Sequence, residues 1–279
     1  MTPNPGIALI TGASSGIGAA FARRLARDGY DLLLHGRREA LLSQLRDELT
    51  AAYGTNIRII LAELSDPAGV RKLEEIIPET PALSMLVNNA GYSTLRFFEH
   101  EDRDRQQRLV DVHIVAPLRL MHAAIPVMRA RGGGSIINVS SVAGFVVGPG
   151  SATYGATKAC LTNLTESLHI ELQGSGIRVQ ALCPGFTISD FHQRLGYDTT
   201  AEFFRGFMSA DEVVDTSLRD LKRGKVVSIP GLRYKMAALL SRSLPRRLMY
   251  RAASAVRRRQ RAQGGLHDPH ADPQRRSMI

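Results

Sequence analysis

The sequence predicts an α/β fold in which a doubly wound, parallel β-sheet carries helices on both faces. Three observations predict it. Continuous apolar runs alternate with helical segments of about ten residues or more, the pattern of parallel strands buried on both faces. A glycine-rich turn joins the first strand to the first helix. Residues that can carry chemistry follow several strands, at the carboxyl edge where open α/β sheets bind their ligands.

The expected elements alternate between strand and helix from residue 7 to residue 229. Ser209 and Glu212 form a capping box, which marks the start of the last of these helices. Right-handed crossovers between parallel strands then give a doubly wound sheet. The expected strands are residues 7–11, 32–34, 57–61, 83–88, 135–140, 177–183 and 225–229, and the expected helices are residues 19–27, 39–52, 67–77, 102–130, 152–173 and 210–223.

The chain of 279 residues is long enough for one large domain or two small ones, but no linker divides it before residue 232. We therefore predict one domain over 1–231, a basic amphipathic helical extension over 232–261 and an unstructured tail over 262–279. Apolar residues in the extension recur at helical spacing around a break at Pro245.

The net charge of +10 lies entirely in the extension and the tail, because residues 1–232 hold 24 basic and 24 acidic side chains. A pI of about 10.1 would indicate a nucleic-acid partner if this charge covered the folded body. Since it does not, we expect no nucleic-acid partner. A basic amphipathic helix can lie on an anionic membrane surface, close a substrate cleft or pack against a second subunit, and the sequence leaves these alternatives open.

Two cysteines, Cys160 and Cys183, lie in apolar runs and lack metal-ligand spacing. We expect buried free thiols, with no disulfide framework and no metal site. The first residues show no basic-then-apolar signal pattern, and no apolar run approaches the length of a membrane-spanning helix. These features predict a cytoplasmic protein, with peripheral membrane contact through the extension as an open alternative.

The glycine-rich turn predicts a phosphate site. Gly12 permits a tight turn, and Gly16 permits close approach of a pyrophosphate. The helix that starts there offers free N–H groups and a positive dipole end, although a helix start that merely needs glycine is the alternative. The residues expected to contact the nucleotide here are Gly12, Ser14, Ser15, Gly16, Ile17 and Gly18.

The end of the second strand indicates which dinucleotide binds. An acidic residue at this point would hold a ribose 2′-hydroxyl and favour NAD. Gly36 stands there instead, followed by Arg37 and Arg38. Guanidinium groups suit a 2′-phosphate, so we expect NADP, the alternative being two solvated arginines at a helix start.

Tyr154 precedes Lys158 by one helical turn, which places both side chains on one helix face. A nearby ammonium lowers the pKa of a phenol from its usual value of about 10, so the pair can exchange a proton with an alcohol or ketone oxygen. Alone, such a spacing is usually a solvated helix face. Here Ser141 ends another strand on the same side of the predicted sheet.

These segments together resemble the short-chain dehydrogenase/reductase family. The residues that match in order and spacing, over about residues 6–231, are Thr11 to Gly18, Asn88-Asn89-Ala90-Gly91, Ser141, Tyr154, Lys158 and Pro184-Gly185. The resemblance implies a Rossmann-type sheet of seven parallel strands and NAD(P)-dependent chemistry between alcohols and ketones. It also implies pairing of subunits through the helices 102–130 and 152–173.

The resemblance assigns a role to each catalytic residue. Tyr154 would be the acid/base, and Lys158 would lower its pKa and hold the nicotinamide ribose. Ser141 would hydrogen-bond the substrate oxygen. The same resemblance supports Arg37 as the residue that selects NADP. Further cofactor contacts are expected from Asn88, Ala90, Gly91, Pro184 and Gly185.

The chain departs from the family pattern at three places. His113 stands where the family has an asparagine that holds a relay water, so His113 either passes a proton or simply packs in its helix. Glu63, followed by Leu64, replaces the aspartate expected near adenine. Thr187 or Ser189 is the candidate for the contact to the carboxamide.

The segment 186–209 holds five of the nine phenylalanines, where the family places its substrate loop. It lies opposite the apolar residues 142–147. An apolar carbonyl substrate is expected, such as a 3-ketoacyl chain or a polycyclic ketone, unless these side chains only pack the loop. The competing hypothesis is a nucleotide-binding sensor or scaffold with little turnover. The presence of Ser141, Tyr154 and Lys158 together argues against it.

Overall fold

The structure is a computed structural model of the chain and describes residues 5–93, 96–188 and 207–262. Most of the aromatic segment 186–209, including Ser189, lies outside these ranges. The prediction of an unstructured tail also falls almost entirely outside the described residues.

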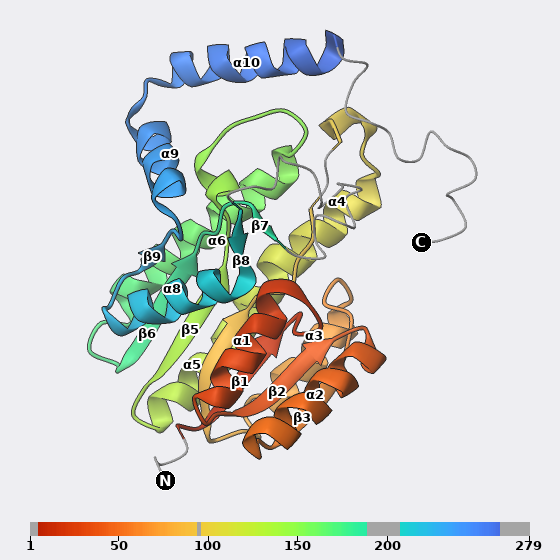
Figure 1. Ribbon diagram of the computed structural model, residues 1–279, viewed down its shortest axis with the longest axis vertical. Helices are drawn as coiled ribbons and strands as arrows, with labels where there is room; N and C mark the ends of the chain where they lie inside the picture. The colour runs from red at the N-terminus through yellow and green to blue at the C-terminus, as the bar shows by residue number, and fades with distance from the viewer. Residues whose placement is uncertain (1–4, 94–95, 189–206, 263–279) are drawn as a thin grey trace, which may run out of the picture.

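Seven parallel strands form the central sheet, in the order β3-β2-β1-β4-β5-β6-β9 (Figure 1). The strand order reverses between β1 and β4, which is the topological switch point of a doubly wound sheet. This confirms the predicted fold class. The bounds are β1 Ile7–Thr11, β2 Asp31–Gly36, β3 Ile57–Leu61, β4 Leu83–Asn88, β5 Gly134–Val139, β6 Ile177–Leu182 and β9 Val227–Ser228.

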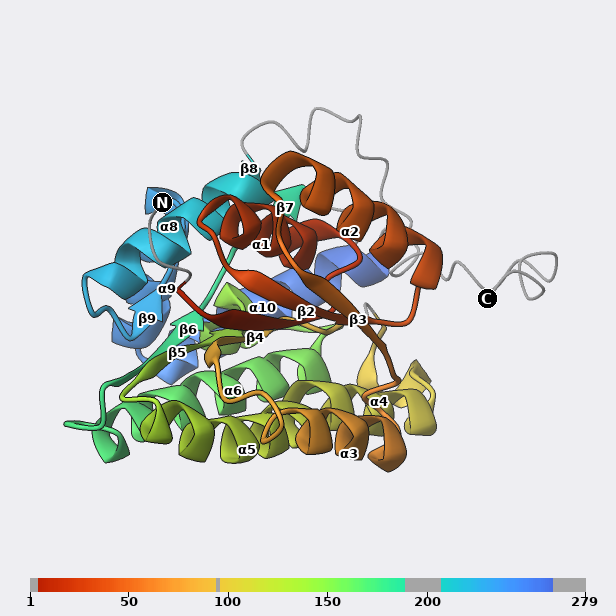
Figure 2. The ribbon, with the colours of Figure 1, turned by 90° about the horizontal axis from the view of Figure 1, so that it is seen from below.

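Helices cover both faces of the sheet. Figure 2 shows α1, α2 and α8 on one face and α3, α5 and α6 on the other. Short 3₁₀ segments, η1 (Phe98–His100) and η3 (Val142–Phe145), lie in the loops. The helix bounds are α1 Gly16–Arg27, α2 Glu39–Tyr53, α3 Pro67–Ile76, α4 Arg103–Val110, α5 Ala116–Ala130, α6 Ala152–Glu171, α8 Ala210–Lys222, α9 Leu232–Ser243 and α10 Arg246–Ala262.

Side chains that alternate along the strands divide the core into two layers. In β1, Ala8 and Ile10 belong to the cluster beneath α1, α2 and α8, whereas Leu9 belongs to the cluster beneath α3, α5 and α6. Each fully buried Leu or Ile contributes about 1.5–3 kcal/mol of apolar burial. Because both faces are buried, the strands are continuous apolar runs, as the sequence pattern predicts.

The helix expected over 102–130 contains a π-helical turn, η2 (Asp111–Val115), between α4 and α5. The whole stretch Arg103–Ala130 is long and apolar enough to cross a membrane by length and composition, contrary to the expectation from the sequence. Its inward side chains, including Leu120 and Ala124, are nevertheless buried against the sheet. It therefore packs as a core helix of this fold.

Three further features differ from the expectations or extend them. A two-stranded parallel pair, β7 (Thr187–Ile188) and β8 (Met208–Ser209), lies beyond β6. Cys183 is buried as expected, but Cys160 is exposed, because it faces outward from α6. In the extension, α9 ends just before Pro245, and α10 projects from the body (Figure 1).

Candidate active site

The loops that follow β1, β4, β5 and β6 share the carboxyl edge of the sheet because these four strands are neighbours. Thr11 closes β1 and joins it to the loop after β4. Its hydroxyl oxygen accepts hydrogen bonds from the backbone N–H groups of Asn89 (2.9 Å) and Ala90 (3.0 Å). The Asn89 side chain in turn donates to the carbonyl oxygens of Thr11 (2.9 Å) and Gly12 (3.1 Å). These bonds fasten the glycine turn to the neighbouring loop.

Glycine is needed at different positions of the turn for different structural reasons. Gly12 and Gly16 have φ angles of +67° and +55°, which side chains of L-residues rarely adopt. A Cβ atom on Gly18 would lie 2.3 Å from the Gly12 carbonyl oxygen. Gly18 is therefore needed for the close approach of α1 to the turn, while Ile17 packs partly buried against the core.

The turn fits a diphosphate. Ser15 is the N-cap residue of α1, and its side chain makes no capping bond to the helix. The first N–H groups of α1 therefore face the loop edge without a side-chain cap, next to a positive dipole end. This combination of glycine turn and helix N-terminus is suited to an anionic group.

Arg38 lies over the serines of the turn. Its Nη2 donates to the hydroxyl oxygens of Ser14 (2.8 Å) and Ser15 (2.7 Å). Arg37 points elsewhere and donates to a carboxylate oxygen of Glu63 (2.7 Å). Two hydroxyls and a guanidinium thus meet beside the end of β2, a donor set suited to a phosphate monoester.

Glu63 is engaged through both carboxylate oxygens, one with Arg37 and the other with the Ser65 backbone N–H (3.1 Å). Burial works to raise the pKa of this carboxyl, but the two hydrogen bonds outweigh burial and hold the pKa below its ordinary value. The neighbouring Leu64 is buried in the core. Contact of Glu63 with adenine remains a prediction.

His35, which the sequence analysis missed, supports the turn from below. The Gly12 N–H donates to His35 Nδ1 (3.4 Å), so Nε2 carries the ring proton and donates to the Ala62 carbonyl oxygen (3.2 Å). Burial lowers the pKa of His35 to about 4, which keeps the ring neutral. The sequence feature that could have identified His35 is its position at the end of a buried strand, one residue before Gly36.

Ser141, Tyr154 and Lys158 lie together beyond β5. Ser141 begins η3, and its hydroxyl oxygen accepts from the Ala143 N–H (3.1 Å). Lys158 is buried, and its Nζ lies 5.7 Å from the centre of the Tyr154 ring. The Ser141 hydroxyl also interacts with the Tyr154 phenol, since it works to lower the pKa of that phenol. The grouping expected from the sequence is therefore present in space.

Three hydrogen bonds hold Lys158 in place. Its ammonium donates to the Val139 carbonyl oxygen (2.8 Å) at the end of β5. The Lys158 carbonyl oxygen accepts from the hydroxyls of Ser140 (2.8 Å) and Thr162 (2.9 Å). Gly144 allows η3 to approach α6, because a Cβ there would lie 2.9 Å from the α6 backbone.

The pKa of Tyr154 differs from the expectation. Burial raises it above the ordinary value, the Ser141 hydroxyl lowers it in part, and Cys183 adds to the rise. Burial also lowers the pKa of Lys158 to about 8, against an opposing effect of Cys183. The expected lowering by Lys158 is not among the causes of the shift: burial disfavours a phenolate and dominates, while the Lys158 ammonium binds the Val139 carbonyl oxygen.

His113, in the π-helical turn, is buried and held at both ring nitrogens. The Tyr92 N–H donates to Nε2 (3.2 Å), and Nδ1–H donates to the Thr157 hydroxyl oxygen (3.0 Å), whose own proton goes to the Tyr154 carbonyl oxygen (2.8 Å). Burial, followed by the charge of Lys158, lowers the pKa of His113 well below its ordinary value. Gly91 makes room, since a Cβ there would lie 2.6 Å from His113 Nε2.

The remaining site residues follow β4 and β6. Asn88 is buried within the sheet, where its side chain donates to Asn138 (2.8 Å), and its own Oδ1 has no hydrogen-bond partner among the described residues. The Pro184 carbonyl oxygen accepts from the Val142 N–H (3.0 Å), which joins the loops after β5 and β6. Thr187 donates to the Gly185 carbonyl oxygen (3.1 Å). Their contacts with a cofactor remain predictions.

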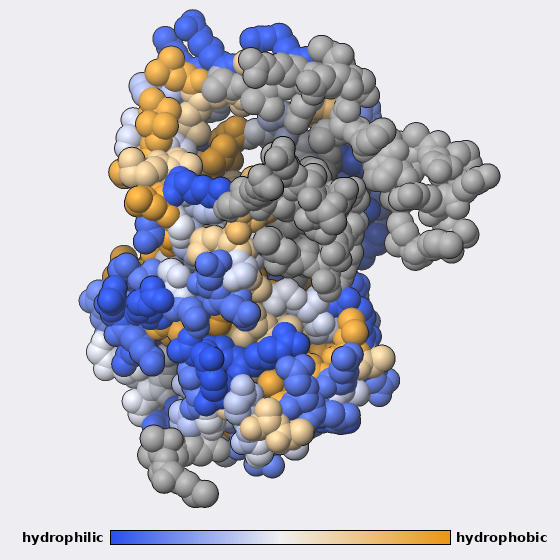
Figure 3. Space-filling view, viewed as in Figure 1, coloured by the Kyte–Doolittle hydropathy of each residue, from blue (hydrophilic) through white to orange (hydrophobic). Residues whose placement is uncertain are grey.

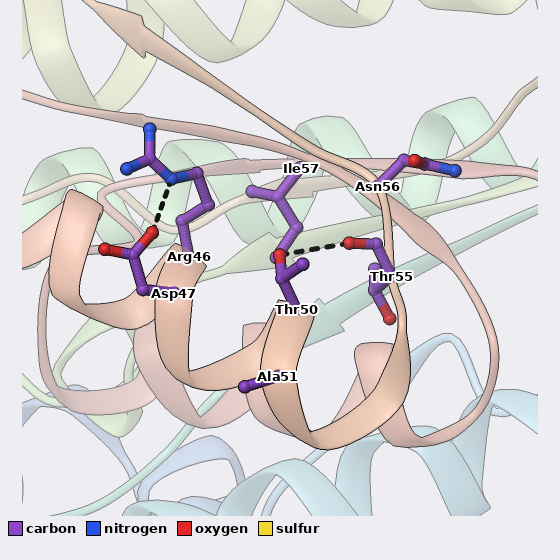
Figure 4. Close-up of a pocket in the computed structure, with 7 residues that line it drawn as sticks. All are labelled: Arg46, Asp47, Thr50, Ala51, Thr55, Asn56 and Ile57. Carbon is purple, nitrogen blue, oxygen red and sulfur yellow. Dashed lines mark hydrogen bonds and ion pairs between the residues drawn. The ribbon is translucent and has the colours of Figure 1, made fainter.

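Other places in the described ranges offer no comparable grouping. No three His, Cys, Asp or Glu side chains there are placed to hold a metal ion. A hollow beside α2 lies at the start of β3, the opposite edge of the sheet, away from the residues above (Figure 4). Its lining residues are Arg46, Asp47, Thr50, Ala51, Thr55, Asn56 and Ile57.

Comparison with known proteins matches residues 6–199 to the short chain dehydrogenase family. Sulfoacetaldehyde reductase 2 of Chromohalobacter salexigens is 37% identical over 188 residues, which cover 66% of this chain and 74% of the relative.

Two solved structures resemble the chain over nearly its whole length. A short-chain dehydrogenase from Sphingobium yanoikuyae in complex with NADPH is 33% identical, with a TM-score of 0.77 over 95% of this chain and 97% of that one. The bulky-bulky ketone specific alcohol dehydrogenase from Comamonas testosteroni is 31% identical, with a TM-score of 0.74 over 98% of this chain and 99% of that one. The chain therefore belongs to the short-chain dehydrogenase/reductase family of NAD(P)-dependent oxidoreductases.

Proposed function

We propose that this protein uses NADP(H) to transfer hydride between nicotinamide and a ketone or secondary alcohol, with Ser141, Tyr154 and Lys158 as catalytic residues. The observation that carries the proposal is their grouping at the sheet edge that also bears the glycine turn. A protein that only binds a nucleotide has no need of this grouping. In this proposal residues 1–231 form the catalytic domain, and residues 232–261 form an accessory extension.

When bound, the nicotinamide supplies or accepts the hydride. The chain's own residues act on the oxygen. Ser141 Oγ is oriented by the Ala143 N–H, and its hydroxyl donates a hydrogen bond to the carbonyl oxygen without giving up its proton. Tyr154 Oη gives that oxygen its proton, and the raised pKa keeps the phenol protonated at neutral pH.

Lys158 stabilises the phenolate that proton transfer leaves behind. Its ammonium has three N–H donors, of which the Val139 carbonyl takes one. The ribose hydroxyls of the nicotinamide half are the expected acceptors for the others. The pKa of about 8 means that the charge is present at neutral pH and is lost as the pH rises above this value.

An apolar carbonyl substrate is proposed, such as a 3-ketoacyl chain or a polycyclic ketone. Val146 and Val147, in the loop that follows Ser141, and Phe186, which follows Gly185, are about half exposed, and their side chains support an apolar edge of the site. The bulky-ketone specificity of the Comamonas relative supports this choice. Turnover of small aldehydes remains compatible with the fold, as the sulfoacetaldehyde reductase illustrates.

Replacement of Tyr154 by Phe is expected to lower kcat for ketone reduction by at least about a hundredfold, the usual effect of losing a general acid. NADPH binding should persist, because the glycine turn and Arg38 are unchanged. NADPH oxidation and NADPH fluorescence titration measure the two quantities. Tyr53→Phe, at an exposed position on α2, is the matched control. Near-normal turnover of Tyr154→Phe would exclude the assignment.

NADP selection is proposed to rest on Arg38 with Ser14 and Ser15, and on Arg37. Arg38→Ala should raise the KM for NADPH by about ten- to a hundredfold, since a hydrogen bond to a charged group contributes about 1.5–3 kcal/mol. The KM for NADH should change little. Arg46→Ala, in the helix α2 that begins just after Arg38, is the control. An equal loss for both cofactors would show that Arg38 only supports the turn.

We propose that His113 positions the site and does not relay protons, because protein groups occupy both ring nitrogens. His113→Asn should then keep kcat within about threefold, raise the KM for NADPH by loosening the loop at Tyr92, and leave the pH profile of kcat unchanged between pH 5 and 8. Burial, followed by the charge of Lys158, lowers the pKa of the wild-type ring well below its ordinary value and so favours the neutral ring. If the pH profile of kcat in His113→Asn lacked one limb that the wild-type profile has, His113 would instead be identified as a proton relay.

Two surfaces are proposed for contacts outside the site. Exposed apolar residues on α5 (Leu118) and α6 (Ile170) support a homo-oligomer that pairs through these helices. The extension combines arginines with exposed apolar residues on α9 and α10, which gather at the upper left of the molecule in Figure 3. With 12 basic and 2 acidic residues after residue 232, it suits the anionic surface of a membrane facing the cytoplasm.

A shortened form of the protein that ends at Leu244 tests the two proposed surfaces independently. The full chain should sediment with vesicles of phosphatidylglycerol and phosphatidylcholine, and the shortened form should not, because it lacks α10. Both forms should contain the same number of subunits by sedimentation velocity, since α5 and α6 are intact. Equal vesicle binding of both forms would remove the membrane proposal, and a monomeric short form would place the subunit contact on α10.

A further inference from the structure

Two short segments beyond β6 come together beside the site. β7 and β8 pair in parallel, with Thr187 opposite Met208. Just before each of these strands, the rings of Phe186 and Phe207 stack with their centres 5.0 Å apart and their planes 13° apart. The Met208 N–H also donates to the Phe186 carbonyl oxygen (3.4 Å). We call residues 185–188 and 207–209 the two stems.

Tyr234 of α9 lies directly on the first stem. A Cβ atom on Gly185 would lie 2.3 Å from two carbon atoms of the Tyr234 ring, so a side chain at position 185 would displace the ring. The Tyr234 hydroxyl donates to the Phe186 carbonyl oxygen (3.3 Å). The ring therefore covers one residue of this stem and hydrogen-bonds the next.

Arg233 extends the contact to the second stem. Its guanidinium carbon lies 4.5 Å from the centre of the Tyr234 ring and 5.9 Å from the centre of the Phe207 ring. Its Nη2 donates to the Tyr234 hydroxyl oxygen (2.7 Å). A guanidinium near two aromatic faces is a favourable cation–π arrangement, and here it connects α9 with both stems.

The contacts of α9 with the body are concentrated at this place. Ala238 is buried at 3% exposure and Tyr234 is half-buried, whereas Leu232 and Met236 are exposed. Tyr234 and Ala238 are one helical turn apart and share a face. Besides the stems, α9 packs against η3, the segment that begins beside Ser141. The same helix thus touches both loops that border the catalytic hydroxyl.

We propose that α9 is a working part of the active site, in which Arg233 and Tyr234 clamp the two stems and thereby set the size of ketone that the site accepts. The proposal rests on the proposed reductase function. Gly185 joins the stem to Pro184, whose carbonyl oxygen binds the Val142 N–H, so a shift of the stem reaches the loop of Ser141. Arg233 and Tyr234 act through these loops and are positioning residues.

Full-length variants test the clamp. Tyr234→Phe removes the hydrogen bond to Phe186 and keeps the ring, Tyr234→Ala removes both, and Arg233→Met removes the guanidinium. Tyr250→Ala is the matched control, since Tyr250 is a half-exposed tyrosine of the same extension, in α10. The ratio of kcat/KM for a diaryl ketone to that for a small dialkyl ketone is the catalytic readout.

We expect Tyr234→Ala and Arg233→Met to change this ratio at least fivefold, through a higher KM for the diaryl ketone. The kcat for the small ketone should stay within twofold, and Tyr234→Phe should give a smaller change. A merely structural role would lower both activities together. A ratio equal to that of the wild type in both Tyr234→Ala and Arg233→Met would overturn the proposal.

Hydrogen exchange separates failure of the clamp from failure of the proposed function. In Tyr234→Ala, peptides that cover the two stems should exchange at least fivefold faster than in the wild type or in Tyr250→Ala. Unchanged exchange would overturn the clamp even in an active enzyme. If no ketone is reduced by the wild type, the reductase proposal fails, and with it the role in ketone size, while the exchange rates still decide whether α9 holds the stems.

Discussion

The close contact between the end of β1 and the loop after β4 is the constraint on which the rest of the site depends. At the switch point of a doubly wound sheet the connections leave in opposite directions, which opens a crevice there. Thr11 and Asn89 bridge it with hydrogen bonds, and the absence of a side chain on Gly18 lets α1 start against the same place. The glycine turn is thereby positioned relative to the loops that lead to Ser141 and Tyr154.

A second constraint is the burial of charge and polar groups around Ser141, Tyr154 and Lys158. An isolated buried ammonium is unfavourable, and the fold offsets this with a carbonyl oxygen at the end of β5. His35 and His113 show the complementary solution, since both stay neutral and use one ring nitrogen as donor and the other as acceptor. Each thus joins two separate segments of the chain without adding a charge.

The sequence was sufficient for the architecture and for the grouping of Ser141, Tyr154 and Lys158, because apolar runs, glycine turns and helical spacing are local properties. It was insufficient wherever a tertiary contact decides the outcome. The exposure of Cys160 depends on which face of α6 meets the sheet. The pKa of Tyr154 depends on burial, and the partners of His113 come from the Tyr92 backbone and from α6.

The extension illustrates how one helix can serve two surfaces. In α9, Tyr234 and Ala238 face the stems and η3, while Leu239 and Leu240 remain exposed on the outside. A partner on the outer face, whether a lipid surface or a protein, would therefore leave the inner contacts in place. Both faces belong to the same helix. If a partner bound to the outer face and shifted α9, the stems that contact its inner face would therefore move as well. Such coupling would require α9 to move as a rigid element. Its regular helical span, Leu232–Ser243, is the physical basis for such a movement.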